Sequence, residues 1–129
     1  MEKVLVSGPV IIVDGRLLVV GDNKDNFYKL PGGTVNPGED LIAACKREVR
    51  EEINGDIDIL RELSPMNINW SKGKPVDIEL HHYLALLKNP GGIHCGNDIE
   101  EIRWFYVDRL NQYNIAPNIK FLLERGEIK

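Results

Sequence analysis

The segment from Gly32 to Gly55, GGTVNPGEDLIAACKREVREEING, constrains the fold more than any other part of the chain. Two glycine-bearing turns precede a stretch with apolar residues at helical spacing. This pattern predicts a helix that begins near Asp40 and ends at Asn54–Gly55. The side chains expected on its buried face are those of Leu41, Ile42, Cys45 and Val49. The opposite face is therefore free to carry polar groups.

Three carboxylates share that polar face, because residues three and four apart on a helix lie beside one another. They belong to Glu48, Glu51 and Glu52. Clustered negative charges repel unless a positive charge lies among them, and Mg²⁺ or Mn²⁺ prefers such oxygen ligands. Taken alone, a solvated acidic face is the simpler interpretation. The spacing of the residues around the cluster decides between the two.

The composition limits the classes of protein to consider. A net charge of -4 argues against a surface for nucleic-acid polymers, which is normally basic. No apolar run is long enough to span a membrane and no secretory signal is visible, so we expect a cytoplasmic protein. Cys45 and Cys95 make neither a disulfide framework nor a zinc site. We expect residues 1–129 to form one domain.

The rest of the chain predicts mostly strands. Val4 to Val13 predicts a strand that Gly8–Pro9 interrupts as a bulge, an edge or a break. Asp14–Gly15 between two apolar runs predicts a tight hairpin. Ser64 to Pro75 has a less regular pattern. Further strands are expected at Phe27–Leu30, Ile57–Leu63, Val76–Leu87 and Ile102–Val107, and a closing helix at Pro117–Arg125.

The spacing that starts at Gly33 resembles the Nudix box, the pattern G-x5-E-x7-R-E-U-x-E-E-x-G-U in which U is apolar. The residues that stand at its next specified positions are Glu39, Arg47, Glu48, Val49, Glu51 and Glu52. The pattern then has Gly where this chain has Asn54, and an apolar residue where it has Gly55. Either Gly55 takes the helix cap after a slip of one residue, or Asn54 adopts the left-handed conformation itself. The segments Leu30–Gly33 and Glu100–Phe105 extend the resemblance beyond the box.

The resemblance implies an α+β fold, a Nudix-type α/β/α sandwich with a mixed β-sheet. It also implies Mg²⁺- or Mn²⁺-dependent hydrolysis of a nucleoside diphosphate linked to another group, by attack of water on phosphorus. The residues that would bind the metal are Glu48, Glu51 and Glu52, together with the backbone carbonyl of Gly32. Arg47 would orient the carboxylates, with Glu39 as its partner. The general base is left open among Glu51, Glu52 and an acidic residue within 98–101.

The sequence leaves the substrate open. A nucleoside triphosphate, a dinucleoside polyphosphate and an ADP-sugar all fit the resemblance, and the expected partner is a small nucleotide rather than a nucleic-acid polymer or a membrane. The candidate substrate contacts are Phe27, Tyr28, Gly33 and Trp70, whose aromatic members can stack on a base. A homodimer is left open. The alternative is a non-catalytic Nudix-like nucleotide-binding or sensor module, which has no chemical need for the full set of box glutamates and Arg47.

Overall fold

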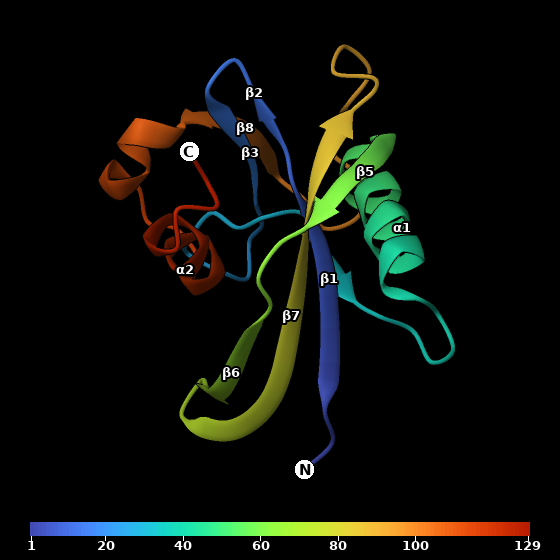
Figure 1. Ribbon diagram of the computed structural model, residues 1–129, viewed down its shortest axis with the longest axis vertical. Coiled ribbons are helices and arrows are strands. Elements are labelled where there is room, and N and C mark those ends of the chain that lie inside the picture. Colours follow the sequence, from blue (N-terminus) through green and yellow to red (C-terminus); the bar gives the residue numbers. More distant parts are fainter.

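The computed structural model describes all residues from Met1 to Lys129, and Figure 1 shows two helices on opposite sides of a layer of strands. The elements are β1 (Val4–Val10), β2 (Ile12–Val13), β3 (Arg16–Gly21), β4 (Gly33–Thr34), α1 (Leu41–Ile53), β5 (Ile57–Glu62), β6 (Met66–Ser71), β7 (Lys74–Leu87), β8 (Glu101–Tyr106), a 3-10 helix (Val107–Gln112) and α2 (Pro117–Glu124). One sheet has the order β4-β1-β7-β5, with β6 also paired to β7, and the other has the order β2-β3-β8. Neither α1 nor α2 is long and apolar enough to cross a membrane.

The first sheet is mixed, because β1 and β7 run parallel while β4, β5 and β6 pair antiparallel. The predicted α+β sandwich with a mixed sheet is therefore confirmed. The core has two halves that meet at β3. Leu18 and Val20 pack with the α1 side of the core, whereas Leu17 and Val19 pack with the α2 side. All four side chains are fully buried. Burial on both faces explains why the β3 sequence is an unbroken apolar run.

The strand at the N-terminus continues through Gly8–Pro9 and ends at Val10. At Pro9 the strand has a free edge, since β4 pairs only with Val6 and Ser7. A break into a second strand, β2, also occurs, but it lies at Ile11 and not at Gly8–Pro9. Gly8 serves close packing, because a Cβ there would collide with the carbonyl oxygen of Pro31. The loop that leads into β4 thus lies directly on β1.

The predicted hairpin at Asp14–Gly15 is confirmed. Both residues have positive φ, 52° and 74°, and β2 pairs antiparallel with β3 across them. These angles belong to the tight turn whose twist matches that of the flanking strands.

The helix α1 begins and ends as predicted. The side chain of Asp40 accepts a hydrogen bond from the Ala43 N–H at 2.7 Å and caps the first turn. Asn54 has a left-handed φ of 54° and donates its N–H to the Arg50 carbonyl. Asn54 is therefore the cap, and the slip that would give this position to Gly55 is wrong. A Cβ on Gly55 would lie 2.8 Å from the Val49 side chain, so Gly55 is needed for packing.

The loop between β7 and β8 closes the C-terminal end of α1. The backbone N–H groups of His94, Gly96 and Asn97 donate hydrogen bonds to the carbonyls of Ile53, Glu52 and Glu51, at 3.0, 2.7 and 3.0 Å. The last carbonyls of a helix have no partner within the helix itself. This loop supplies those partners and fixes the turn that carries two of the predicted metal ligands.

Two predictions about local structure are wrong. Ile42 was expected in the core but is 41% exposed, because the first turn of α1 lies beside an open hollow and not under the strands. Phe27–Leu30 is not a strand but makes isolated bridges at Tyr28 and Lys29. Each of these two residues bonds to a different neighbouring segment, so no ladder can grow.

The segment Ser64–Pro75 is more regular than its sequence indicates. It contains β6, which forms a hairpin with β7 through a two-residue turn at Lys72–Gly73. A register shift between Ile68 and Trp70 interrupts the pairing and hides the alternation expected of a strand. The 3-10 helix after β8 also had no counterpart in the sequence-based prediction.

A substitution in the capping loop tests how much this loop stabilises the protein. Gly96→Ala places a Cβ against the Glu51 carbonyl, a backbone atom that cannot move without displacing α1. We expect the free energy of unfolding to fall by about 1–3 kcal/mol, measured by chemical denaturation. Gly91→Ala in the same loop is the matched control, since its Cβ would meet no atom within 4 Å. Equal stability of the two variants would contradict the capping role.

Candidate active site

Arg47 lies at the centre of a charged cluster on α1. Its Nε and Nη2 atoms donate hydrogen bonds to the two carboxylate oxygens of Glu39, each at 2.9 Å. Nη2 also donates to the Thr34 carbonyl oxygen at 3.0 Å. The predicted partnership of Arg47 with Glu39 is confirmed in the two-pronged geometry that a guanidinium favours. The arginine thereby ties the loop before α1 to the helix.

The third nitrogen of the same guanidinium holds two of the box glutamates. Nη1 of Arg47 donates to Oε1 of Glu48 and to Oε1 of Glu51, each at 2.9 Å. The Glu48 side chain is 15% exposed and that of Glu51 is 40% exposed. The hydrogen bonds to Glu39, Glu51 and Glu48 raise the pKa of Arg47, so its positive charge is permanent. It offsets part of the negative charge that gathers on this face.

Glu52 is held separately from that network. Its Oε1 accepts a hydrogen bond from the backbone N–H of Gly32 at 2.8 Å. Burial and the nearby charge of Glu48 raise the pKa of the Glu52 carboxyl to about 7, although the Gly32 N–H acts in the opposite direction. Glu52 and Glu48 are thus close enough to repel each other within a cleft that is partly shielded from water.

Two adjacent glycines bring the backbone up to these carboxylates. Gly32 has a φ of 141°, and a Cβ on it would lie 2.6 Å from the Ser7 carbonyl oxygen. A Cβ on Gly33 would lie 2.7 Å from the carboxylate of Glu48. The loop before β4 therefore approaches the helix only because both side chains are absent. Gly33, which the sequence suggested as a substrate contact, lies against Glu48.

The three box glutamates line one acidic cavity of about 340 Å³. The segment after β3, the β6–β7 turn and the capping loop supply the other walls. The lining residues are Asp22, Lys24, Asp25, Lys29, Glu48, Glu51, Glu52, Lys72, Asn97, Asp98 and Ile99. Lys29 is held within it by Asp22, whose Oδ2 accepts a hydrogen bond from Nζ at 2.6 Å. Of the acidic residues proposed between 98 and 101, Asp98 lines the cavity.

A second cavity of about 260 Å³ adjoins the first, and Lys29 lines both. It lies between β1, β7 and the start of α2, and its walls include Phe27, Ile68 and the edge of Gly32. The remaining lining residues are Val6, Gly8, Leu30, Pro31, Leu80, His81, His82, Ala116, Pro117 and Asn118. This cavity is largely apolar, with a few polar groups, which is typical of a site for a flat organic ring.

A hydrogen-bonded polar pair, buried His82 and half-buried Asn118, forms one wall of this second cavity. His82 is 2% exposed, and burial lowers its pKa to about 4, so its imidazole is neutral near pH 7. Its Nε2 lies 3.1 Å from Nδ2 of Asn118, while its Nδ1 has no hydrogen-bond partner. A neutral ring accepts from the amide, which leaves the amide oxygen of Asn118 free to accept a hydrogen bond.

The aromatic residues suggested by the sequence occupy different surroundings. Phe27 lines the second cavity. Tyr28 lines neither of the two cavities described above and packs edge-on against Phe105, with ring centroids 4.9 Å apart. Trp70 is 64% exposed and lines neither cavity. The structure therefore brings only Phe27 to the cavities beside the carboxylates.

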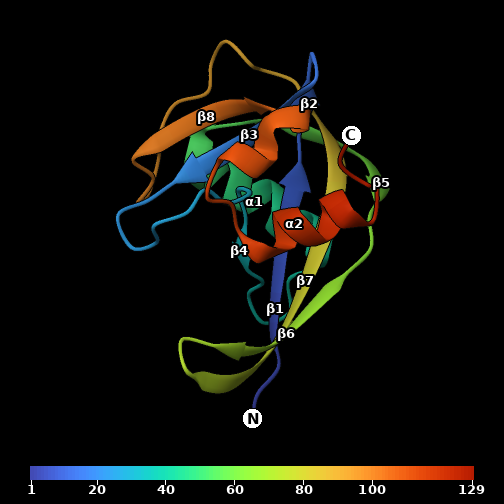
Figure 2. The same cartoon turned by 90° about the vertical axis from the view of Figure 1, so that its left-hand side faces the viewer.

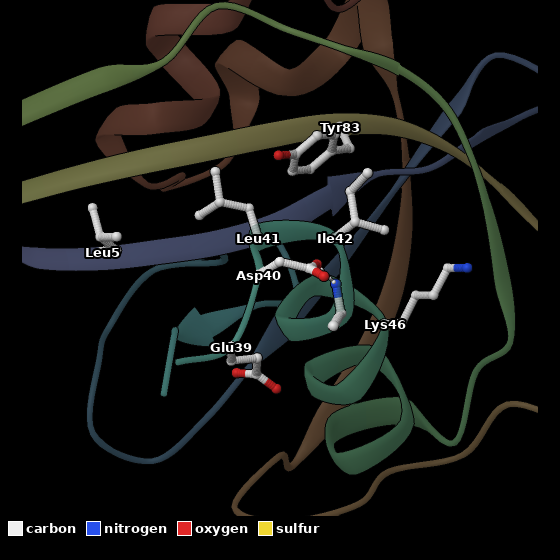
Figure 3. Close-up of a pocket in the computed structure, with 8 residues that line it drawn as sticks. Leu5, Glu39, Asp40, Leu41, Ile42, Lys46 and Tyr83 are labelled. Atoms are coloured by element: carbon white, nitrogen blue, oxygen red, sulfur yellow. Dashed lines mark hydrogen bonds between the residues drawn. The ribbon is translucent and has the colours of Figure 1, made fainter. Parts of the chain in front are cut away.

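The largest hollow lies elsewhere. Its volume is about 670 Å³, and Figure 3 shows Leu5, Leu41 and Tyr83 gathered around the first turn of α1. It includes Glu39 but none of Glu48, Glu51 and Glu52. The volume of a cavity therefore does not by itself identify the one that the three glutamates line.

The carboxylates fit a divalent cation by their charge and placement, though not as a ready-made cage. No three His, Cys, Asp or Glu side chains converge in positions that could hold a metal ion as they stand. Arg47 engages Glu48 and Glu51, and the Gly32 N–H engages Glu52. Mg²⁺ is usually bound through one or two carboxylates with water and substrate phosphate completing its shell, so this partial set is suitable.

Several residues of the cavities escaped the sequence-based interpretation. Lys24, Lys29 and Lys72 come from two separate loops, and His82 and Asn118 from a strand and a distant helix. Lys29 had one available signal, since it immediately precedes the Leu30–Gly33 lead-in. The others have no local pattern that marks them.

Comparisons with known proteins agree with this geometry. A family model described as the NUDIX domain matches residues 4–125. The chain is 27% identical to the nucleoside triphosphatase NudI of Salmonella agona, over 89% of this chain and 90% of that protein.

Solved structures share the fold. The MutT NUDIX hydrolase from Burkholderia pseudomallei has a TM-score of 0.84 at 23% identity, covering 96% of this chain and 98% of that one. An Ap4A hydrolase from C. elegans has a TM-score of 0.77, also at 23% identity, covering 95% of this chain and 94% of that one.

The coupling between Glu52 and Glu48 can be measured directly. In protein freed of divalent cations, we expect the Glu52 carboxyl to titrate near pH 7, followed by the ¹³C chemical shift of its Cδ. Glu48→Gln removes a neighbouring negative charge and should lower this pKa. Glu62→Gln, at an exposed position of β5, should leave it unchanged. A Glu52 pKa near the ordinary 4.5 would contradict the arrangement described.

The same shift predicts a pH dependence of stability. A carboxyl whose pKa is raised in the folded state binds more protons there than in the unfolded chain. Its contribution therefore makes the fold less stable as the pH rises from about 4.5 to about 7. We expect Glu52→Gln to remove this loss, measured as the difference in unfolding free energy between pH 5 and pH 8 relative to Glu62→Gln.

Proposed function

Since the chain belongs to the Nudix hydrolase family, whose members are pyrophosphohydrolases, we propose that it hydrolyses a nucleoside diphosphate linked to a further group, with Mg²⁺ or Mn²⁺. The observation that carries the proposal is the pair of adjoining cavities. One is rich in carboxylates and lysines, the other is mainly apolar, and Lys29 lines both. A nucleotide has the same division, with a charged phosphate chain on one side and a flat ring on the other.

The box residues have complementary parts in this proposal. Glu48, Glu52 and Glu51 would hold the cation, together with the backbone carbonyl of Gly32. A cation at these carboxylates would neutralise charge on the phosphate oxygens and lower the pKa of a bound water. Arg47 is a positioning residue, because it touches the glutamates and holds them in place through Glu39 and the Thr34 carbonyl.

The proton of the attacking water needs an acceptor within the acidic cavity. Glu51, Glu52 and Asp98 line that cavity, whereas Glu101 lines another one beside Tyr28. We assign the role to this smaller set. Glu52 has a raised pKa of about 7 in the metal-free protein, close to the value that suits proton transfer near neutral pH.

The second cavity would take the nucleoside. Phe27 offers a ring for stacking, and the amide oxygen of Asn118 offers an acceptor whose orientation His82 fixes. The relative named nucleoside triphosphatase supports a triphosphate as the first substrate to test. A cytoplasmic location stays a prediction from the sequence. The alternative, a non-catalytic sensor, predicts nucleotide binding without release of any product.

Removal of one charge at the metal site tests the catalytic assignment. Glu52→Gln keeps the shape of the side chain but weakens a ligand that is also a candidate base. We expect turnover of a nucleoside triphosphate panel to fall at least about 100-fold, with the fold intact by circular dichroism. Glu62→Gln should retain wild-type turnover. Near-normal activity in Glu52→Gln would refute the assignment, and no Mg²⁺-dependent turnover by the wild type on any substrate would favour the sensor.

A second substitution tests where the nucleobase of the substrate binds. Phe27→Ala removes the ring that lines the second cavity and should raise KM about 10-fold with little change in kcat, as expected for lost stacking. Trp70→Ala removes an exposed ring outside the cavity and should change KM less than about 2-fold. The reverse order of effects would place the nucleobase on Trp70 instead.

A further inference from the structure

The hairpin of β6 and β7 projects from the body of the protein (Figure 2). Its two-residue turn, Lys72–Gly73, has φ values of 52° and 77° and joins Ser71 directly to its partner Lys74. The two lysines that flank Gly73 lie in different surroundings. Lys72 lines the acidic cavity, whereas Lys74 does not. The turn therefore brings one lysine from a distant part of the chain to the cavity that the carboxylates of α1 also line.

Two of the lysines in this cavity have no carboxylate partner. Lys29 is engaged by Asp22 at 2.6 Å and by Asp25 at 3.5 Å. Lys24 and Lys72 form no ion pair anywhere in the protein, and both are exposed. Unpaired cations beside a cavity that also contains carboxylates are placed to attract a negatively charged group, since such contacts with an ionised acceptor are the stronger hydrogen bonds.

The position of these lysines indicates how the proposed substrate would be oriented across the two cavities. The apolar cavity with Phe27 and Asn118 is at one side of Lys29, and Glu48, Glu51 and Glu52 lie in the cavity at its other side. A phosphate chain that starts at a nucleoside in the apolar cavity passes Lys29 before it reaches these glutamates. The cationic groups of this cavity that have no ion-pair partner, Lys24 and Lys72, are available to a phosphate further along the chain.

We propose that Lys72, with Lys24, binds a phosphate beyond the second phosphorus of the substrate, so that the protein selects nucleoside triphosphates over nucleoside diphosphates linked to an uncharged group. This inference rests on the function proposed above. An uncharged sugar at the same place would cover both ammonium groups without offering them an opposite charge, which costs free energy. A third phosphate supplies that charge. Lys72 is thus a residue that determines specificity, and the β6–β7 turn is the element that positions it.

A measurement of ligand binding tests this inference independently of hydrolysis. We would measure Kd by calorimetry, with Mg²⁺, for a non-hydrolysable α,β-methylene nucleoside triphosphate and for the corresponding methylene nucleoside diphosphate-hexose. Lys72→Met should weaken binding of the triphosphate by about 10-fold or more and change binding of the hexose compound less than about 2-fold. Lys72→Arg, which keeps the charge, should recover most of the affinity. Lys74→Met is the matched control on the same turn and should change neither Kd.

The kinetic counterpart uses the same variants with hydrolysable substrates. The loss in Lys72→Met should be mainly in KM for the triphosphate, because Lys72 is not among the residues proposed to hold the cation or to accept the proton. Equal weakening of both ligands, or tighter wild-type binding of the hexose compound, would overturn the inference while leaving hydrolysis intact. Absence of turnover with a preserved, Lys72-dependent preference for the triphosphate would instead refute the proposed hydrolysis and support this binding assignment.

Discussion

The placement of several negative charges on one face of α1 depends on a single guanidinium. Two unit charges 4 Å apart interact by about 4 kcal/mol at the effective dielectric near a protein surface, so unscreened glutamates would drive this face apart. Arg47 lies among Glu39, Glu48 and Glu51, with contacts of 2.9 Å to each. A lysine could not replace it, since only a planar fork reaches three carboxylates and a carbonyl together. The same contacts fix the loop before α1, because Thr34 ends β4 where that loop begins and Glu39 lies near the end of the loop.

The two sides of the acidic cavity differ, because the helix side is rigid and the opposite side carries exposed residues. On the helix side, Asp40 caps one end of α1 and the loop from His94 to Asn97 caps the other, so the glutamates start from a fixed backbone. On the opposite side, Lys24 and Lys72 are exposed residues on turns. A site that must hold reacting groups within fractions of an ångström benefits from the first arrangement. Groups that only attract a flexible phosphate tail tolerate the second.

The sequence predicted most of what depends on local chemistry. The Asp14–Gly15 turn, the Asp40 cap and the spacing of the box glutamates follow from rules that act within a few residues, and each is found in the structure. Errors arose where a distant segment decides the outcome. The exposure of Ile42 depends on what lies beside the first turn of α1, and the regularity of β6 depends on its pairing with β7. The same limit applies to the cavities, because Lys72 and Asn118 reach them only through long-range packing.

Lys29 links these observations, because it is the one residue that lines both the apolar and the acidic cavity. Its ammonium group donates a hydrogen bond to Asp22, and this bond and the negative charge of Glu52 raise the pKa of Lys29. Both effects help keep the group charged despite its partial burial. A cation fixed at the boundary favours a ligand whose charge begins there and continues into the acidic cavity. A ligand with charge at both ends would have to place one charged end among the apolar side chains of Phe27, Ile68 and Leu80, which costs free energy. The asymmetry of the two cavities therefore fits the substrate proposed above, which is uncharged at one end and anionic at the other.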